Sequence, residues 1–264
     1  MRSGEFDVGL HPILQDACSP EGLLTMLWNH LLLEPHGLSW WGTVCSTWVW
    51  MSRGSTERSL QFPMGRRDLK CVNDANCQVA RMVLILMMCM VLRQHWVLEQ
   101  PASSLMLASP WMRFLAWLKT PVTIQTWMCM FNGDTRKSTA LTSHSIWISH
   151  LARQRDVSKD SLWMAVQGVK HLAPHPDGRQ RLQGMPELKG SQTYTPEFGT
   201  AVKAEWAKER NRLDGFVALA AVDEDEDVSW DEWRVAQQYQ PDWSAARLQE
   251  VCAFCDVPFG RPIV

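Results

Sequence analysis

Residues 38–48 read Leu-Ser-Trp-Trp-Gly-Thr-Val-Cys-Ser-Thr-Trp, and residues 95–101 read His-Trp-Val-Leu-Glu-Gln-Pro. In each segment a short apolar run, typical of a buried strand, stops just before a side chain that can do chemistry. The first run leads to the thiol of Cys45 and the second to the carboxylate of Glu99. A long apolar helix between the two strands would make them parallel, which brings both groups to one edge of a sheet. That edge is where open α/β sheets build their sites.

The sequence on either side continues this alternation. Ser19-Pro20 and Ser109-Pro110 each predict a helix start, because serine caps the free amides of a first turn and proline suits the first helical position. Asn132-Gly133 is a tight-turn signal, so the strands around it should form an antiparallel hairpin. We expect helices over 20–34, from Asn73 or Asp74 to about Gln94, and over 110–120, with strands at 38–44, 95–99, 122–131 and 138–143.

This order of elements predicts an α/β fold. The sheet should be partial, Rossmann-like and mostly parallel, with helices on both faces and one antiparallel hairpin strand. We expect an α/β domain over residues 1–153, a loop or linker over 154–194, and a loosely packed helical tail over 195–264. The tail contains the acidic run 223–227, which is typical of a solvated segment.

Composition excludes some classes of function. The net charge of −2 gives no global field that favours nucleic acid or an anionic membrane. The apolar run 82–92 is short of the roughly 20 residues that span a bilayer, so we expect a core helix and no membrane partner. The eight cysteines form no regular framework, which favours reduced thiols and an intracellular location, in the nucleus or the cytoplasm. Cys252 and Cys255 lack a second ligand pair, so we expect no metal site.

A family resemblance gives this pattern a chemical meaning. A cysteine after an inner strand, a basic loop, a crossover helix and a glutamate after the next strand resemble the central half of DNA cytosine-5 methyltransferases. Over about residues 20–200 the chain is more specifically similar to a group of mostly uncharacterised protist proteins that look like remote relatives of those enzymes. The shared motifs are Cys45–Val49, Arg53–Ser55, Asn76, Leu98–Ser104, Trp127–Gly133, Lys137–Thr139 and Tyr194–Gly199.

The resemblance implies catalytic roles for two residues. Cys45 matches the thiol that attacks C6 of the base, a task for which a thiolate is the best nucleophile. Glu99 matches the carboxylate that holds and protonates the edge of the base. The target base must leave the duplex, so cations that grip the backbone are expected. The candidates for nucleic-acid binding are Arg53, Arg58, Arg66, Arg67 and Lys70 in a loop, and Arg136 and Lys137 near the hairpin tip. A loop charged only for solubility is the alternative interpretation.

The chain also departs from the family. Val44 stands where the enzymes have proline, and Gln100-Pro101 replaces Asn-Val. No Gly-x-Gly turn follows a strand upstream of residue 38, so we expect no cofactor for this chain, and S-adenosylmethionine only if a missing upstream half is restored. We therefore expect a truncated methyltransferase-like domain that is inactive alone. The alternative is a non-catalytic interaction module or a mobile-element remnant.

Truncation would leave the strand at 38–44 on the edge of the sheet. Trp40 and Trp41 should point to opposite faces of that strand, which predicts a large apolar surface. We expect self-association through this edge unless the chain after residue 190 folds back over it.

Overall fold

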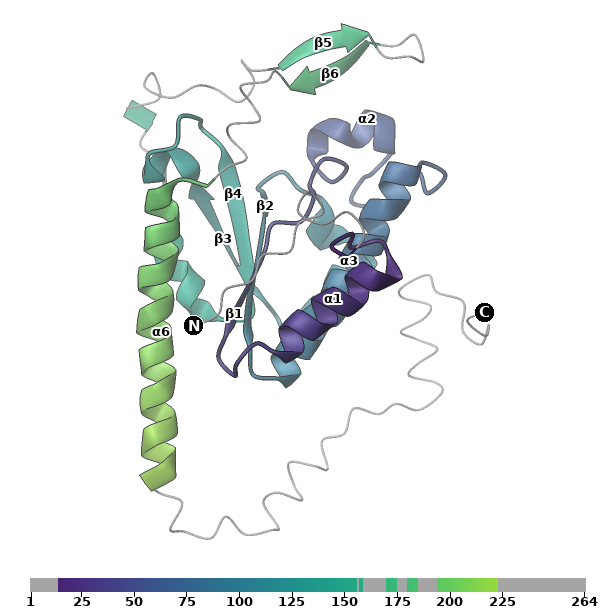
Figure 1. Ribbon diagram of the computed structural model, residues 1–264. Helices are drawn as coiled ribbons and strands as arrows, with labels where there is room; N and C mark the ends of the chain where they lie inside the picture. Colours follow the sequence, from purple (N-terminus) through teal and green to yellow (C-terminus); the bar gives the residue numbers. More distant parts are fainter. Residues whose placement is uncertain (1–13, 156, 159–169, 175–179, 185–193, 223–264) are drawn as a thin grey trace. The chain divides into compact units, whose positions relative to one another are not determined.

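The computed structural model describes residues 14–155, 157–158, 170–174, 180–184 and 194–222. The chain divides into two compact units, residues 1–207 and 208–264, and the sheet belongs to the first (Figure 1). The helices are α1 (Pro20–Leu31), α2 (Arg53–Thr56), α3 (Lys70–Val91), α4 (Pro110–Leu118) and α6 (Pro196–Val222). The strands are β1 (Leu38–Trp41), β2 (His95–Pro101), β3 (Val122–Trp127), β4 (Ser138–Ser143), β5 (Lys170–Pro174) and β6 (Gln180–Gly184).

The first four strands form one open sheet in the order β1-β2-β4-β3, so the α/β class is confirmed. The predicted antiparallel pairing of β3 and β4 is present. The predicted extent of the first strand, 122–131, is wrong, because β3 ends at Trp127 and Met128–Phe131 form a 3₁₀ helix. Asn132-Gly133 therefore lies within a longer connection instead of forming a tight turn between the strands. The prediction of a mostly parallel sheet is wrong. β4 inserts between β2 and β3 and is antiparallel to both, which leaves β1–β2 as the one parallel pair of this sheet. Burial explains the insertion: β4 is buried or half-buried along its length, whereas Thr123 and Gln125 of β3 are exposed and suit an edge.

The two serine-proline starts behave as predicted. Ser19 accepts a hydrogen bond from the Gly22 amide at 2.8 Å, and Ser109 accepts one from the Met112 amide at 3.4 Å. The predicted start of α3 at Asn73 or Asp74 is wrong, because the helix begins at Lys70. Lys70 and Asp74 instead form an i,i+4 ion pair at 2.6 Å within its first turns.

One hydrophobic cluster lies between the sheet and the layer formed by α1, α3 and α4. Trp96 and Leu98 of β2 face this layer, and α3 contributes more buried side chains to the cluster than any other element. The apolar run 82–92 is therefore largely a core segment, as predicted. Among the described residues, α3 is also the one helix long and apolar enough to cross a membrane, and 44% of its most apolar window is buried. Core helices of globular proteins pass the same test.

A second cluster covers the opposite face of the sheet. Val97 of β2 and Leu141 of β4 pack there against Phe198 and Trp206, in the first turns of α6. The two tryptophans of β1 do point to opposite faces: Trp40 packs in this second cluster and Trp41 in the first. Tyr194 and Phe198 therefore cover the face of β1 that carries Trp40. In the described part of the chain, no strand pairs with the outer edge of β1.

The segment 154–194, expected as a loop or linker, contains the antiparallel pair β5–β6. Within the predicted helical tail, α6 extends from Pro196 to Val222. The acidic run 223–227 and the cysteines at 252 and 255 lie outside the described residues.

Candidate functional site

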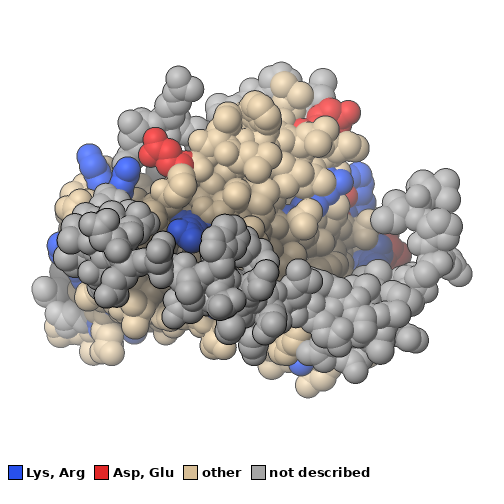
Figure 2. All heavy atoms as spheres, turned by 90° about the horizontal axis from the view of Figure 1, so that it is seen from below, with Lys and Arg blue, Asp and Glu red and all other residues tan. Residues whose placement is uncertain are grey.

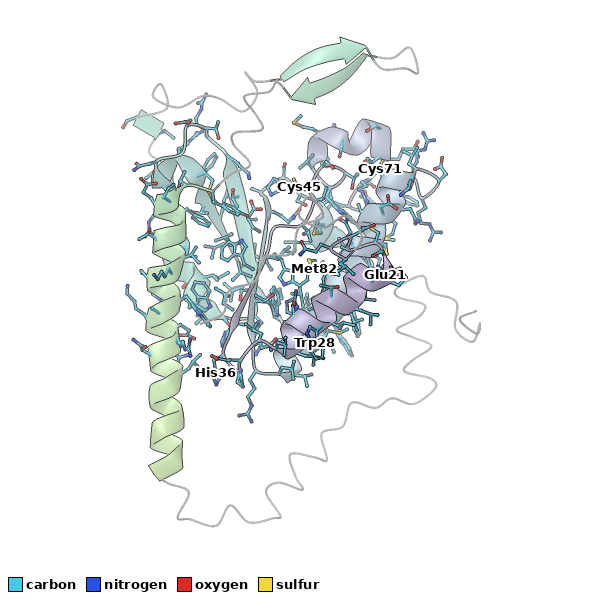
Figure 3. All side chains as sticks on the ribbon, in the orientation of Figure 1. Glu21, Trp28, His36, Cys45, Cys71 and Met82 are labelled. Atoms are coloured by element: carbon cyan, nitrogen blue, oxygen red, sulfur yellow. The ribbon has the colours of Figure 1, made fainter. Side chains whose placement is uncertain are left out.

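The parallel pairing of β1 and β2 brings Cys45 and Glu99 to the same end of the sheet. Trp41, the last residue of β1, lies opposite Leu98 of β2, so the chain reaches Cys45 just beyond the level of Glu99. Figure 3 shows Cys45 at the opposite end of β1 from His36. The carbonyl of Cys45 accepts hydrogen bonds from the amides of Trp48 and Val49, at 2.8 and 3.1 Å. Since Trp48 is fully buried, this turn is anchored in the core.

The side chain of Gln100 connects the two loops of the site by hydrogen bonds. Its side-chain amide donates to the Thr43 carbonyl at 2.9 Å, and its oxygen accepts from the Ser104 hydroxyl at 3.0 Å. The backbones of the same loops also pair, with the Leu105 amide donating to the Trp48 carbonyl at 2.8 Å. The Gln-Pro-x-Ser-Ser motif therefore fixes the loop that carries Cys45 to the end of β2.

Glu99 projects to the face of the sheet that the first turns of α6 cover. It alternates with Val97, which packs in the second hydrophobic cluster, and residues two apart in a strand share a face. Glu99 is only 6% exposed, and its Oε1 lies 3.5 Å from the Nζ atom of Lys137. That oxygen accepts no hydrogen bond. A buried carboxylate oxygen without a hydrogen bond can accept one from a ligand or a water molecule.

Tyr194 joins this group from the segment just before α6. Its hydroxyl hydrogen-bonds Glu99, and burial together with the charge of Glu99 raises the pKa of the phenol. A Cβ atom added to Gly42 would lie 3.3 Å from the same hydroxyl, so the phenol fills the space beside that glycine. The ring also packs against Phe198, with centroids 5.4 Å apart.

Burial raises the pKa of the Cys45 thiol, and the negative charge of Glu99 raises it further, while Lys137 acts in the opposite direction. The thiol is therefore neutral at physiological pH. A nucleophilic cysteine needs a depressed pKa, so this arrangement holds a carboxylate, an ammonium group and two neutral donors but does not activate the thiol. We refer to Cys45, Glu99, Lys137 and Tyr194 as the Cys45–Glu99 cluster.

The structure separates the predicted nucleic-acid contacts into different environments. The prediction is wrong for Arg58, which is 1% exposed. Its guanidinium donates to Asn76 Oδ1 at 2.9 Å, the Val72 carbonyl at 3.2 Å and the Thr47 hydroxyl at 3.3 Å, and it stacks 3.4 Å above the Trp48 ring. Burial lowers its pKa to about 10, so it remains charged at neutral pH. Arg58 therefore holds the basic loop against α3.

Lys137 is also placed differently from the prediction, because its ammonium group pairs with Glu99 and its side chain is 20% exposed. The other candidates are nearer the surface. Arg53 stacks on Trp50, and Arg66 and Lys70 pair with Asp68 and Asp74. Arg67 is exposed and Arg136 is half-buried.

Sequence reasoning missed Tyr194 as a member of the site, and it assigned Lys137 to nucleic-acid contacts instead of the ion pair with Glu99. The signal for Tyr194 was the motif Tyr194–Gly199, a polar aromatic residue followed by the threonine-proline start of α6. Nothing in the spacing of the sequence reveals that this segment returns to β1.

Among the described residues no group of three or more His, Cys, Asp or Glu side chains is arranged to hold a metal ion. The six cysteines of the described segments are all free thiols. No protein-family model, curated protein or solved structure matches this chain.

Proposed function

We propose that this chain is a methyltransferase-like domain of cytosine-5 methyltransferase ancestry that recognises a nucleic-acid base but does not transfer a methyl group by itself. The observation that carries the proposal is the position of Cys45 and Glu99, at the same end of two adjacent parallel strands. The resemblance requires this juxtaposition, which the crossover through α3 and the parallel pairing of β1 and β2 produce.

Glu99 supplies the recognition in this proposal. Its buried Oε1 lies beside Lys137 Nζ, so a hydrogen-bond acceptor and a donor stand next to each other. The edge of a pyrimidine base presents a donor and an acceptor in the same way. Arg53 and Arg67 are exposed outside the cluster and would contact the phosphates.

The residues present do not fit S-adenosylmethionine. In the four-stranded sheet, β1 is the one strand followed directly by glycine, and the hydroxyl of Tyr194 occupies the space beside Gly42. Upstream of β1, the described residues contain the helix α1 and no strand. The proposal therefore includes no methyl-transfer step.

A non-catalytic interaction module is the second candidate. The raised pKa of Cys45 favours it, because the thiol is then not the thiolate that attacks a base. The pairing of Glu99 with Lys137 also favours it, because an ion-paired carboxylate is charged and has no proton to give to a base. In that case Cys45 and Glu99 are structural, and the chain has no preference among bases.

The experiment is a comparison of two short fluorescent single strands that differ at one position, cytosine or an abasic site. We expect tighter binding of the cytosine strand, by about tenfold or 1.4 kcal/mol, and weaker binding of both strands as salt is raised. Glu99→Ala should remove the preference for cytosine, whereas Arg67→Ala should weaken both strands equally.

The control is Glu57→Ala, which removes an exposed carboxylate of the basic loop. An equal affinity for both strands in the parent chain, or a preference that survives Glu99→Ala, would contradict base recognition. Methyl transfer from labelled S-adenosylmethionine to cytosine DNA would contradict the absence of catalysis.

A further inference from the structure

The layer formed by α1, α3 and α4 has an outer surface that is unusually apolar for a helix layer turned away from its sheet. Eight large apolar side chains on it are between 41 and 81% exposed. They are Leu24, Trp28 and Leu31 of α1, Leu32 at its C-terminal cap, Leu84 and Val91 of α3, and Trp117 and Leu118 of α4. We call this surface the apolar helix face.

The spacing of these residues makes the face continuous. Leu24, Trp28 and Leu31 recur at intervals of four and three residues, which places them on one stripe of α1. Leu84 and Val91, two turns apart, form a stripe on α3. α3 packs against both α1 and α4, so the three outer surfaces adjoin (Figure 1). Trp28 lies toward the C-terminal end of α1 (Figure 3).

Charge is scarce on the outer side of these helices, where α4 contributes the exposed Arg113, one turn before Trp117. α1 contains Glu21 as its one Asp, Glu, Lys or Arg residue, and α3 has none after Arg81. The Arg81 side chain donates hydrogen bonds to the carbonyls of Ala17 and Ser19, so it connects α3 to the start of α1. Figure 2 shows a broad expanse of surface without charged side chains. A surface of this kind has no means of attracting nucleic acid or an anionic membrane.

The size of the face matches a protein interface. With the exposed fractions above, the eight side chains present about 600 Å² of apolar surface. A stable dimer buries about 800 Å² per partner, of which somewhat more than half is apolar. The face therefore supplies the whole apolar part of such an interface. Trp28 and Trp117 are the type of side chain that anchors one.

We propose that the apolar helix face is the interface of a symmetric dimer of this chain. A mainly apolar surface is complementary to itself, and an isologous pair related by a two-fold axis covers the same face on both copies. This contact differs from association through the open edge of β1, and it is independent of the proposed base recognition.

The test is the molar mass of the full chain by size-exclusion chromatography with light scattering, combined with sedimentation equilibrium. We expect a dimer with a dissociation constant of about 10 µM or tighter. Trp28→Lys and Val91→Lys, each on the face, should shift the chain to monomer by burying a charge in the contact. Circular dichroism would check that both variants remain folded, as expected for exposed positions.

Ile146→Lys and Leu60→Lys are matched controls, because both residues are as exposed as those of the face but lie outside it, in a 3₁₀ helix after β4 and in the basic loop. These variants should remain dimeric. A monomeric parent chain at about 100 µM, or a dimer that survives both face variants, would overturn the proposal. Binding of a monomeric parent to vesicles of neutral lipid, lost in Trp28→Lys, would overturn it in favour of a lipid surface.

Discussion

Arg58→Ala should destabilise the chain strongly, although a cation in a loop rich in arginine and serine is ordinarily dispensable. Arg58 is 1% exposed, and its guanidinium donates to the Pro63 and Val72 carbonyls and to the side chains of Asn76 and Thr47. Truncation leaves buried acceptors without a donor, at about 1–3 kcal/mol for each one that water does not reach, and removes the stack on Trp48. Since part of the site will rehydrate, we expect a loss of about 3–5 kcal/mol in the free energy of unfolding.

The assay is urea unfolding followed by tryptophan fluorescence, with a thermal scan that should show a fall in Tm of roughly 10 °C for a chain of this size. Arg58→Lys should be intermediate, because an ammonium group keeps the charge but lacks the planar fork. Arg67→Ala, an exposed control in the same loop, should stay within about 0.5 kcal/mol. An Arg58→Ala variant with near-parent stability and reduced affinity for nucleic acid would refute the structural role and restore the surface contact predicted from the sequence.

Three other predictions concern pH and the space beside Gly42. Burial raises the pKa of Cys89 to about 12, so the folded chain keeps the thiol proton to a higher pH than the unfolded chain does. The contribution of this thiol to the free energy of unfolding is complete below about pH 9 and should fall by about 2 kcal/mol by pH 11. Urea unfolding should show this loss in the parent chain but not in Cys89→Ala. Burial, aided by His95, lowers the pKa of His144 to about 4; stability should therefore fall as pH drops from 6.5 to 4, by about 2 kcal/mol, and His144→Gln should flatten this slope. Gly42→Ala should lower the free energy of unfolding by about 1 kcal/mol, because the new Cβ crowds the Tyr194 hydroxyl. In a double-mutant cycle, Tyr194→Phe should reduce this loss. Additive effects of the two substitutions would mean that the two residues do not touch.

Local signals in the sequence predicted much of the fold. The caps at Ser19 and Ser109, the antiparallel pairing of β3 with β4 and the apolar core of α3 are all present, since each depends on residues that are close in the sequence. The order of the strands was not predictable in this way. Whether β4 takes the edge or inserts beside β2 depends on which strand can be buried on both faces, and that is decided by packing across the whole sheet.

In the candidate site, too, the local features were predictable from the sequence and the long-range contacts were not. The meeting of Cys45 and Glu99 follows from the helical crossover between two strands, which the sequence reveals. Tyr194 reaches the site through a long-range return of the chain, and Arg58 turns inward because Asn76 and Trp48 offer it partners. A list of cations in a loop cannot distinguish a buried guanidinium from a solvated one.

The central claim, that Cys45 and Glu99 share one site, is tested most directly by the pH dependence of Cys45 alkylation. The rate with iodoacetamide, followed at the Cys45 peptide by mass spectrometry, gives the pKa of this thiol among the other cysteines. We expect a pKa above the ordinary value in the parent chain, a lower one in Glu99→Gln and a higher one in Lys137→Gln, because the two charges act on the thiol in opposite directions. Glu57→Gln should change nothing. A Cys45 pKa that is the same in the parent, Glu99→Gln and Lys137→Gln chains would contradict the shared site.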